Sequence, residues 1–240
     1  MARNEPNYLL NAMVGLLKDE PKGRVIDLGC GDGDYSVAVK NMGFDVIATD
    51  LDVPRFKRKE IEFRVCDVTK PMPFNAGEFN YAILAEVIEH LRNPFDVIRE
   101  ISRILAPGGK LIISTPNILN LKSRLRFVFE GTWEYFREPP LENAHNPNMT
   151  AFNVHLIPWR YPELEYLLHD CGFDVEKNVT SQYDGTGMAF LKPLIAYQMK
   201  SKEARSKKKN GLDYSRINKV MLSDDILFGR HLVIKAVKRA

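Results

Sequence analysis

The 240-residue sequence has few cysteines and no long apolar run. Its three cysteines, Cys30, Cys66 and Cys171, are odd in number and far apart, which argues against a disulfide framework and against a zinc site. No apolar run approaches the ~18 to 20 residues that a membrane-spanning helix needs, and the N-terminal residues lack the pattern of a secretory signal. These absences favour a cytoplasmic protein with reduced thiols.

A large excess of either charge is also missing, because the net charge is only +3. Residues 200–209 carry six positive charges and one negative charge, which leaves a net −2 on the rest of the chain. Since no broad basic face is left, the sequence disfavours a nucleic-acid partner. With 45% apolar residues, the chain can bury the core of one domain without disulfides or a metal.

Apolar runs alternate with helical patterns, which is typical of an α/β protein with a mostly parallel sheet covered on both faces. We expect strands at residues 24–28, 44–49, 61–65, 110–114, 173–179 and 231–237, and a strand followed by a short helix within 79–91. We expect helices at 9–17, from Gly33 to near Gly43, at 94–105 and at 162–171. We interpret residues 1–240 as a single domain with two insertions, at about 117–154 and 180–229.

A glycine-rich turn follows the first expected strand, in the sequence Val25-Ile-Asp-Leu-Gly-Cys-Gly-Asp-Gly33. Glycines let the backbone approach a ligand closely, and Asp50 at the end of the next strand can accept both hydroxyls of a ribose. The dinucleotide fingerprint requires a glycine where this chain has Asp34, and a second acid, Asp32, would also repel a pyrophosphate. The turn therefore favours a nucleoside-bearing ligand with positive charge, and a dehydrogenase is disfavoured.

Five segments in order resemble the motifs of class I S-adenosylmethionine-dependent methyltransferases. They are the glycine turn at 25–33, the second strand with its acid at 47–51, the turn at 65–68, the strand and short helix at 79–91, and the turn and strand at 105–115. The core resembles the ubiquinone-biosynthesis O-methyltransferases, and the segment from Ser114 to Gly172 resembles the methionine-biosynthesis W-type group. The resemblance implies a Rossmann-like three-layer sandwich whose seven-stranded sheet is mostly parallel with an antiparallel last strand.

The resemblance also implies a binding site for S-adenosyl-L-methionine and its product S-adenosyl-L-homocysteine. Gly29 and Gly31 would line the methionine part of the cofactor, and Asp50 would bind its ribose. Asp67 would recognise the edge of its adenine. The full set implied to bind the cofactor is Asp27, Gly29, Cys30, Gly31, Asp50, Leu51, Asp67, Val68 and Glu86.

The candidate catalytic residues are Glu86, His90 and His155. If Glu86 opens a helix, His90 lies four residues on and shares its face, which makes His90 a candidate general base. His155 follows the first insertion and could reach the same site, as could Asn117. We expect an oxygen acceptor on a small molecule or a lipid- or glycan-type molecule, and no metal.

Two alternatives stay open. Glu86, Glu89, His90 and His155, followed by Trp159, are similar to the metal site of RNA 2′-O-methyltransferases that act on small-RNA 3′ ends. A non-catalytic cofactor-binding assembly subunit would keep Asp50 but transfer no methyl group.

The two insertions carry the remaining expectations. We interpret residues 117–154 as a lid over the acceptor, because ligands bind at the carboxyl ends of the strands in open α/β sheets. In the second insertion, residues 188–197 are apolar and precede the basic run. This combination suggests peripheral contact of residues 188–209 with an anionic membrane.

Overall fold

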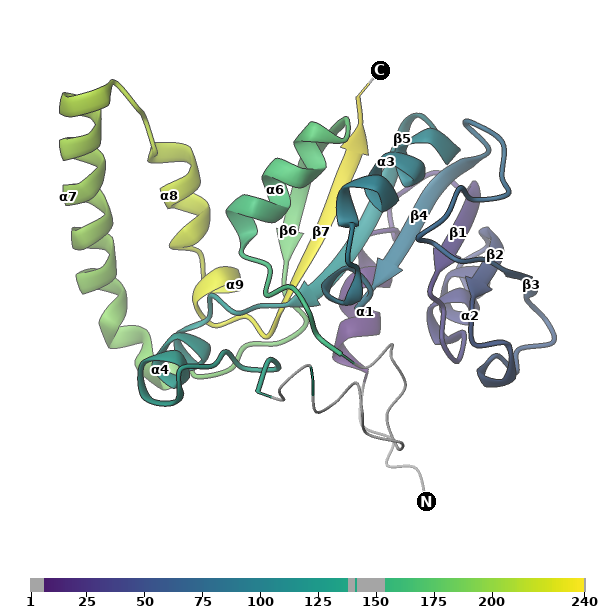
Figure 1. Cartoon of the computed structure of the whole chain (residues 1–240), viewed down its shortest axis with the longest axis horizontal. Helices are drawn as coiled ribbons and strands as arrows, with labels where there is room; N and C mark the ends of the chain where they lie inside the picture. Colours follow the sequence, from purple (N-terminus) through teal and green to yellow (C-terminus); the bar gives the residue numbers. More distant parts are fainter. Residues whose placement is uncertain (1–6, 138–140, 142–153, 240) are drawn as a thin grey trace.

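A computed structural model describes residues 7–137, 141 and 154–239. Its centre is a seven-stranded sheet in the order β3-β2-β1-β4-β5-β7-β6 (Figure 1). The strands are β1 (Arg24–Leu28), β2 (Asp45–Asp50), β3 (Glu62–Val65), β4 (Phe79–Ala85), β5 (Leu105–Pro116), β6 (Phe173–Val179) and β7 (His231–Lys238). The first five pair in parallel, whereas β7 runs antiparallel to β5 and β6, which confirms the expected fold class.

Apolar helix faces cover both sides of the sheet. Along β1, Ile26 packs into the layer that contains helices α3 and α6, and its neighbour Val25 packs into the layer with α1 and α2. This alternation follows from the two-residue period of a strand. The helices are α1 (Tyr8–Gly15), α2 (Asp34–Asn41), α3 (Pro94–Ile104) and α6 (Tyr161–Asp170).

The observed strand boundaries agree closely with those predicted from the sequence, except at β5. That strand spans Leu105–Pro116 rather than 110–114. Its first residue, Leu105, already pairs with Phe79, and the register then shifts before Tyr81 pairs with Lys110. The Pro-Gly-Gly sequence at 107–109 therefore marks an irregularity within paired strands as well as the end of α3.

The second insertion is helical. It contains η4 (Thr186–Leu191), α7 (Lys192–Asn210), α8 (Ser215–Met221) and α9 (Asp224–Leu227), and α7 and α8 project from the sheet as a hairpin (Figure 1). Phe190, Leu194 and Tyr197 are exposed along η4 and α7. Among the helices of the described residues, none is both long and apolar enough to cross a membrane. Peripheral membrane contact stays a prediction.

The first insertion begins with α4 (Leu121–Glu130), and most of 138–153 lies outside the described residues, so the lid stays a prediction. The expectation that Asn117 reaches the site is wrong. Its buried side-chain amide donates to the backbone carbonyls of Ile226 (2.9 Å) and Gly229 (2.8 Å). Asn117 therefore fastens the start of one insertion to the end of the other.

Candidate functional site

The glycine turn joins β1 to α2 in a conformation that side chains resist. Gly29, Gly31 and Gly33 all have positive φ, at 72°, 54° and 82°. A Cβ on Gly29 would also lie 2.7 Å from a methyl carbon of Val87. Only glycine satisfies both the backbone angle and this close approach. The amides of Gly29 and Cys30 donate to the carbonyl of Thr49, so the glycines contribute a surface without side chains on which a ligand can lie.

Asp50 fastens the end of β2 to this turn. One carboxylate oxygen accepts the backbone N–H of Gly31 (2.8 Å), and the other accepts that of Asp52 (2.8 Å). Each oxygen keeps a further lone pair that a ribose hydroxyl could use. The neighbouring Leu51 is exposed, so its side chain can pack against a flat ring. The two residues thus fit the ribose and adenine of the implied cofactor.

Asp27 is the fourth of the five residues of β1 and is buried. The hydroxyl of Ser36 donates to its carboxylate (2.5 Å). Burial raises the pKa of Asp27 to about 6, although the Ser36 hydrogen bond opposes the shift. Near pH 7 the group is still mostly ionised, so it could attract the ammonium group of a methionine moiety.

Asp67 follows β3, next to the partly buried Val68. Its carboxylate accepts both the hydroxyl (2.6 Å) and the backbone N–H (3.0 Å) of Thr69. These bonds, the side-chain one above all, hold the pKa of Asp67 below its usual value. A charged acceptor at this position suits the amino edge of an adenine.

The acids of the turn are not free charges. Asp32 forms an ion pair with Arg55 in η1 (Val53–Arg55) at 2.9 Å, and Asp34 forms one with Arg58 at 2.5 Å. Both arginines follow β2 and lie against the turn. The repulsion of a pyrophosphate expected from the two acids is therefore reduced, and charge alone does not exclude a dinucleotide here.

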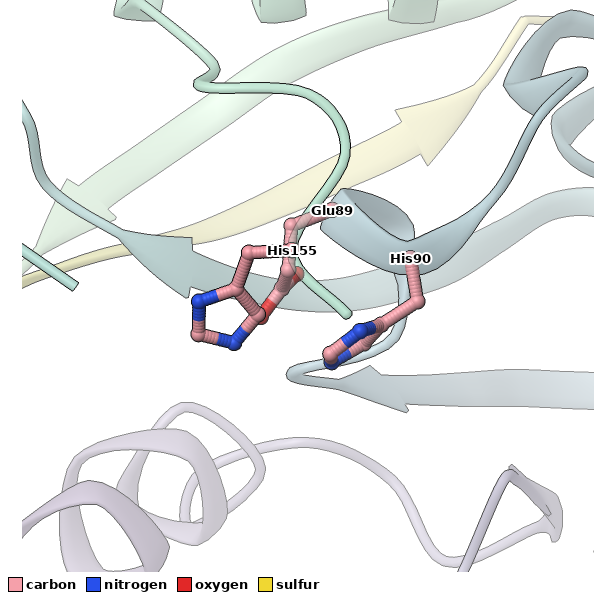
Figure 2. A group of neighbouring side chains, drawn as sticks. All are labelled: Glu89, His90 and His155. Carbon is pink, nitrogen blue, oxygen red and sulfur yellow. The ribbon is translucent and has the colours of Figure 1, made fainter. Parts of the chain in front are cut away.

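Glu89, His90 and His155 come together beyond the end of β4 (Figure 2). Glu89 and His90 belong to the short helix η2 (Ile88–His90), whose Glu89 carbonyl accepts the backbone N–H of Leu156 (2.8 Å). This bond brings the neighbouring His155 to the site, and the two imidazole centroids are 4.8 Å apart. The structure thus places His90 and His155 side by side, and their catalytic roles stay a prediction.

The hydrogen bonds of the two histidines define their tautomers. Nδ1 of His90 faces the carbonyl of Val154 (3.0 Å), and Nδ1 of His155 faces that of Tyr135 (2.5 Å). A carbonyl only accepts, so each Nδ1 carries a proton, and the Nε2 of a neutral imidazole then keeps its lone pair. Burial lowers the pKa of His90, with a smaller contribution from His155, so His90 is neutral at pH 7.

Glu86 does not open a helix, so its expected shared face with His90 is wrong. Its backbone has a positive φ of 53° and turns the chain between β4 and η2. The carboxylate accepts the hydroxyl of Ser114 (2.8 Å) and lies 3.8 Å from Nε2 of His231. Burial raises the pKa of Glu86 to about 7. Glu86 thus faces β5 and β7 rather than the histidine pair.

Residues that the sequence reasoning missed complete this edge of the sheet. His231 opens β7 opposite Pro116 of β5, because an antiparallel strand begins where its parallel neighbours end. Burial lowers its pKa to about 4. Tyr135 stacks on its ring, with centroids 6.0 Å apart. The expected antiparallel last strand was the one signal that could have placed His231 here.

Comparisons of sequence agree with the motifs. The sequence profile of a family described as "Methyltransferase domain" matches residues 1–178. The chain is 36% identical over 185 residues to the ubiquinone biosynthesis O-methyltransferase of Xanthomonas oryzae pv. oryzae. This match covers 65% of the chain and 77% of the relative. The chain is also 30% identical over 159 residues to the protein of that name from Caulobacter sp. (strain K31), but covers only 63% of its length.

Solved structures show the same fold at lower identity. A SAM-dependent methyltransferase from Archaeoglobus fulgidus has a TM-score of 0.58 and 19% identity, covering 95% of this chain and 94% of that one. A SAM-dependent methyltransferase from Methanosarcina mazei has a TM-score of 0.59 and 17% identity, covering 94% and 97%. The ordered motifs, the sheet topology and the family profile agree. The chain belongs to the class I S-adenosylmethionine-dependent methyltransferases.

Proposed function

We propose that the protein transfers a methyl group from S-adenosylmethionine to a hydroxyl oxygen of a small-molecule or lipid- or glycan-type acceptor. The single observation that carries this proposal is the neutral imidazole of His90 beyond β4. Its Nδ1 donates to the Val154 carbonyl, its Nε2 is unprotonated, and the ring of His155 lies beside it. A hydroxyl nucleophile must lose a proton, and a nearby neutral histidine can accept it. The relatives named as ubiquinone biosynthesis O-methyltransferases also support an oxygen acceptor.

Each part of the site has a defined task in this proposal. The glycine turn and Asp50 hold the nucleoside end of the cofactor, and Asp27 attracts its ammonium group. When bound, S-adenosylmethionine supplies a methyl group already activated by a sulfonium. His90 accepts the proton of the acceptor hydroxyl at Nε2, while the Val154 carbonyl fixes the orientation of its ring. His155 lies beside it as the second residue that can orient the hydroxyl.

Replacement of His90 by glutamine tests the proposed base. The release of S-adenosylhomocysteine should be measured with a panel of phenolic, sugar and lipid hydroxyl acceptors. We expect kcat to fall about 10²- to 10⁴-fold in H90Q, with unchanged binding of S-adenosylhomocysteine. In the wild type, kcat should begin to fall only below about pH 6.5 as the solution is made more acidic. The reason is that only the neutral imidazole accepts a proton, and burial lowers the pKa of His90.

The exposed His169 of α6 provides the matched control, and H169Q should behave like the wild type. Full kcat in H90Q would contradict the assignment of the base. Tight binding of S-adenosylhomocysteine without turnover of any acceptor would instead favour a non-catalytic assembly subunit.

A second candidate function rests on Glu89. This side chain is fully buried, and at ordinary hydrogen-bond geometry neither carboxylate oxygen has a partner among the described residues. The nearby hydroxyl of Thr115 only partly offsets the rise in the pKa of Glu89 that burial causes. The ligand atom of Glu89 and those of His90 and His155 lie within 4.8 Å of one another. Histidines that bind a metal usually donate their other N–H to a backbone carbonyl, as both do here. These features fit a divalent cation and support a metal-dependent RNA 2′-O-methyltransferase as the second candidate.

Titration of the EDTA-treated protein with Mn²⁺ tests this candidate by calorimetry. The candidate predicts one bound ion per chain, and at least tenfold weaker binding in Glu89→Gln and in His155→Gln. The control Glu62→Gln changes an exposed acid of β3 and should bind Mn²⁺ like the wild type. The absence of binding, together with turnover that EDTA does not reduce, would eliminate the metal-dependent function and leave the His90 mechanism.

A further inference from the structure

Two residues at this site hold strained backbones. Glu86 and Tyr135, with φ of 53° and 67°, are the non-glycine residues with positive φ in the described part of the chain. Such a conformation is unfavourable for a residue with a side chain and persists only where the surroundings enforce it. Because Glu86 lies 3.8 Å from His231 and Tyr135 stacks on the same ring, both strained residues belong to one site.

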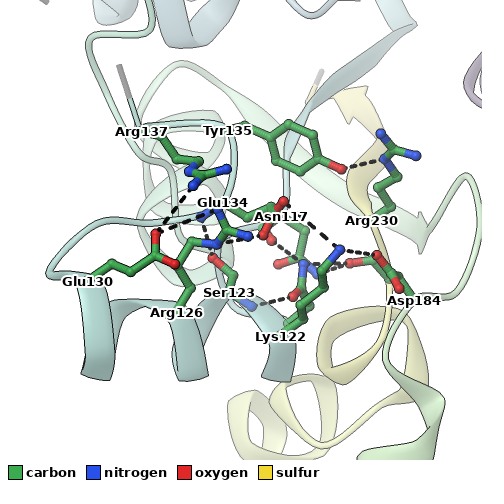
Figure 3. A network of polar contacts seen from close by, with 12 residues as sticks. Asn117, Lys122, Ser123, Arg126, Glu130, Glu134, Tyr135, Arg137, Asp184 and Arg230 are labelled. Atoms are coloured by element: carbon green, nitrogen blue, oxygen red, sulfur yellow. Dashed lines mark hydrogen bonds and ion pairs between the residues drawn. The ribbon is translucent and has the colours of Figure 1, made fainter. Parts of the chain in front are cut away.

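Three contacts hold Tyr135 in place. Its backbone carbonyl accepts Nδ1–H of His155 (2.5 Å), and its ring stacks on His231 at 29°. Its hydroxyl accepts Nε–H of Arg230, whose guanidinium also lies 5.5 Å from the ring centroid (Figure 3). The side chain of Tyr135 therefore spans the distance between the histidine pair and Arg230.

Hydrogen bonds hold the backbone of Arg230, whereas the terminal nitrogens of its guanidinium are available for a ligand. Its N–H donates to the carbonyl of Gln182 (2.9 Å), and its carbonyl accepts the N–H of Asn117 (3.1 Å). Within residues 7–137, 141 and 154–239, its two terminal nitrogens make no hydrogen bond and no ion pair. Figure 3 shows the guanidinium bonded to Tyr135 through Nε alone. The exposed guanidinium can therefore bind a further partner through both terminal nitrogens.

The acids that interact electrostatically with Arg230 already have partners. Asp184 forms an ion pair with Lys122 (2.9 Å), and Glu86 accepts the hydroxyl of Ser114. Burial keeps Glu86 partly protonated at neutral pH, because its pKa is about 7. Neither carboxylate bonds to the two terminal nitrogens of Arg230. The positive charge of the guanidinium is therefore available to a ligand.

We infer that Arg230 and Tyr135 bind an oxyanion of the methyl acceptor, a carboxylate or a phosphate, while the acceptor hydroxyl lies at the histidine pair. A guanidinium binds either anion through two parallel N–H bonds, and the Tyr135 hydroxyl can add a third. Because the side chain of Tyr135 lies between His155 and Arg230, the oxyanion and the reacting hydroxyl are separated by at least the length of an aromatic side chain. This inference rests on the proposed function for the identity of the reacting hydroxyl.

Binding of three probes to the protein saturated with S-adenosylhomocysteine tests the inference. The probes are 4-hydroxyphenylacetate, phenyl phosphate and the neutral 4-hydroxyphenylacetamide, and calorimetry measures each Kd. We expect at least one anion to bind ten times more tightly than the amide, and the preferred anion identifies the group. Arg230→Gln should remove this preference without changing the Kd of S-adenosylhomocysteine.

The control Arg239→Gln changes an arginine beyond the opposite end of β7, where it contacts His169, and should keep the preference. Equal binding of all probes, no binding of any, or a preference that survives in R230Q would overturn the inference. A preference lost in R230Q, in a protein that methylates no hydroxyl, would refute the proposed function and retain the oxyanion site.

Discussion

Replacing Asp50 with alanine should weaken the binding of S-adenosylhomocysteine about 100-fold, or about 3 kcal/mol. The substitution removes both carboxylate oxygens that would accept the ribose hydroxyls, and hydrogen bonds to a charged group contribute about 1.5–3 kcal/mol each. It also removes the acceptor for the Gly31 N–H, so the glycine turn loses its bond to β2. Isothermal titration calorimetry measures the change directly.

Asp45 provides the matched control, because it lies at the other end of β2 and its side chain is 75% exposed. D45A should bind the ligand like the wild type. Thermal unfolding of D50A separates a local loss of binding from a loss of fold. A Kd within threefold of the wild type would show that Asp50 does not bind the ribose.

The cofactor half of the site could be predicted because its signals are local. The glycines at 29, 31 and 33 lie within one turn, and Asp50 closes the next strand along the chain. Parallel neighbouring strands bring these segments to the same edge of the sheet, and Gly31 does bond to Asp50. Strand periodicity predicted the bounds of β1 and β6 for the same reason.

The acceptor half depends on contacts between distant residues. Arg230 meets Tyr135, 95 positions earlier, and the hydrogen bonds of His90 and His155 both end on backbone carbonyls that no residue type reveals. The positive φ of Glu86 had no sequence signal either, because that conformation usually favours glycine. A helical spacing from Glu86 to His90 therefore predicted a shared face that the strained turn prevents.

A network of charges joins β5, β6 and β7 to the segment before β1 and stabilises the fold away from the site. Glu20 accepts hydrogen bonds from Lys110 (2.8 Å) and Lys235 (2.6 Å), and Glu176 pairs with the same two lysines at 3.1 and 2.8 Å. The side chains of Glu20 and Lys235 are only 11% and 9% exposed. Water therefore screens these charges poorly, and each lysine depends on its carboxylates.

Replacing Glu20 with alanine should lower the free energy of unfolding by about 3 kcal/mol, because it leaves two lysines with one carboxylate between them. Chemical denaturation at pH 7 measures this loss. In the control Glu62→Ala, which breaks an exposed ion pair with Arg64, the loss should stay below about 1 kcal/mol. A loss in E20A as small as in E62A would show that Glu176 alone satisfies the lysines.

The pH dependence of stability gives this network a second signature. Burial alone would raise the pKa of Glu20, but hydrogen bonds from Lys110 and Lys235 outweigh it and lower the pKa. A carboxyl whose pKa is lower in the folded state stabilises the fold above its unfolded pKa of about 4.3, and this contribution disappears as the pH falls through the folded value. The stability difference between the wild type and E20A should therefore shrink between pH 5 and pH 3. A difference that stays constant over this range would mean that E20A acts through lost packing rather than lost charge.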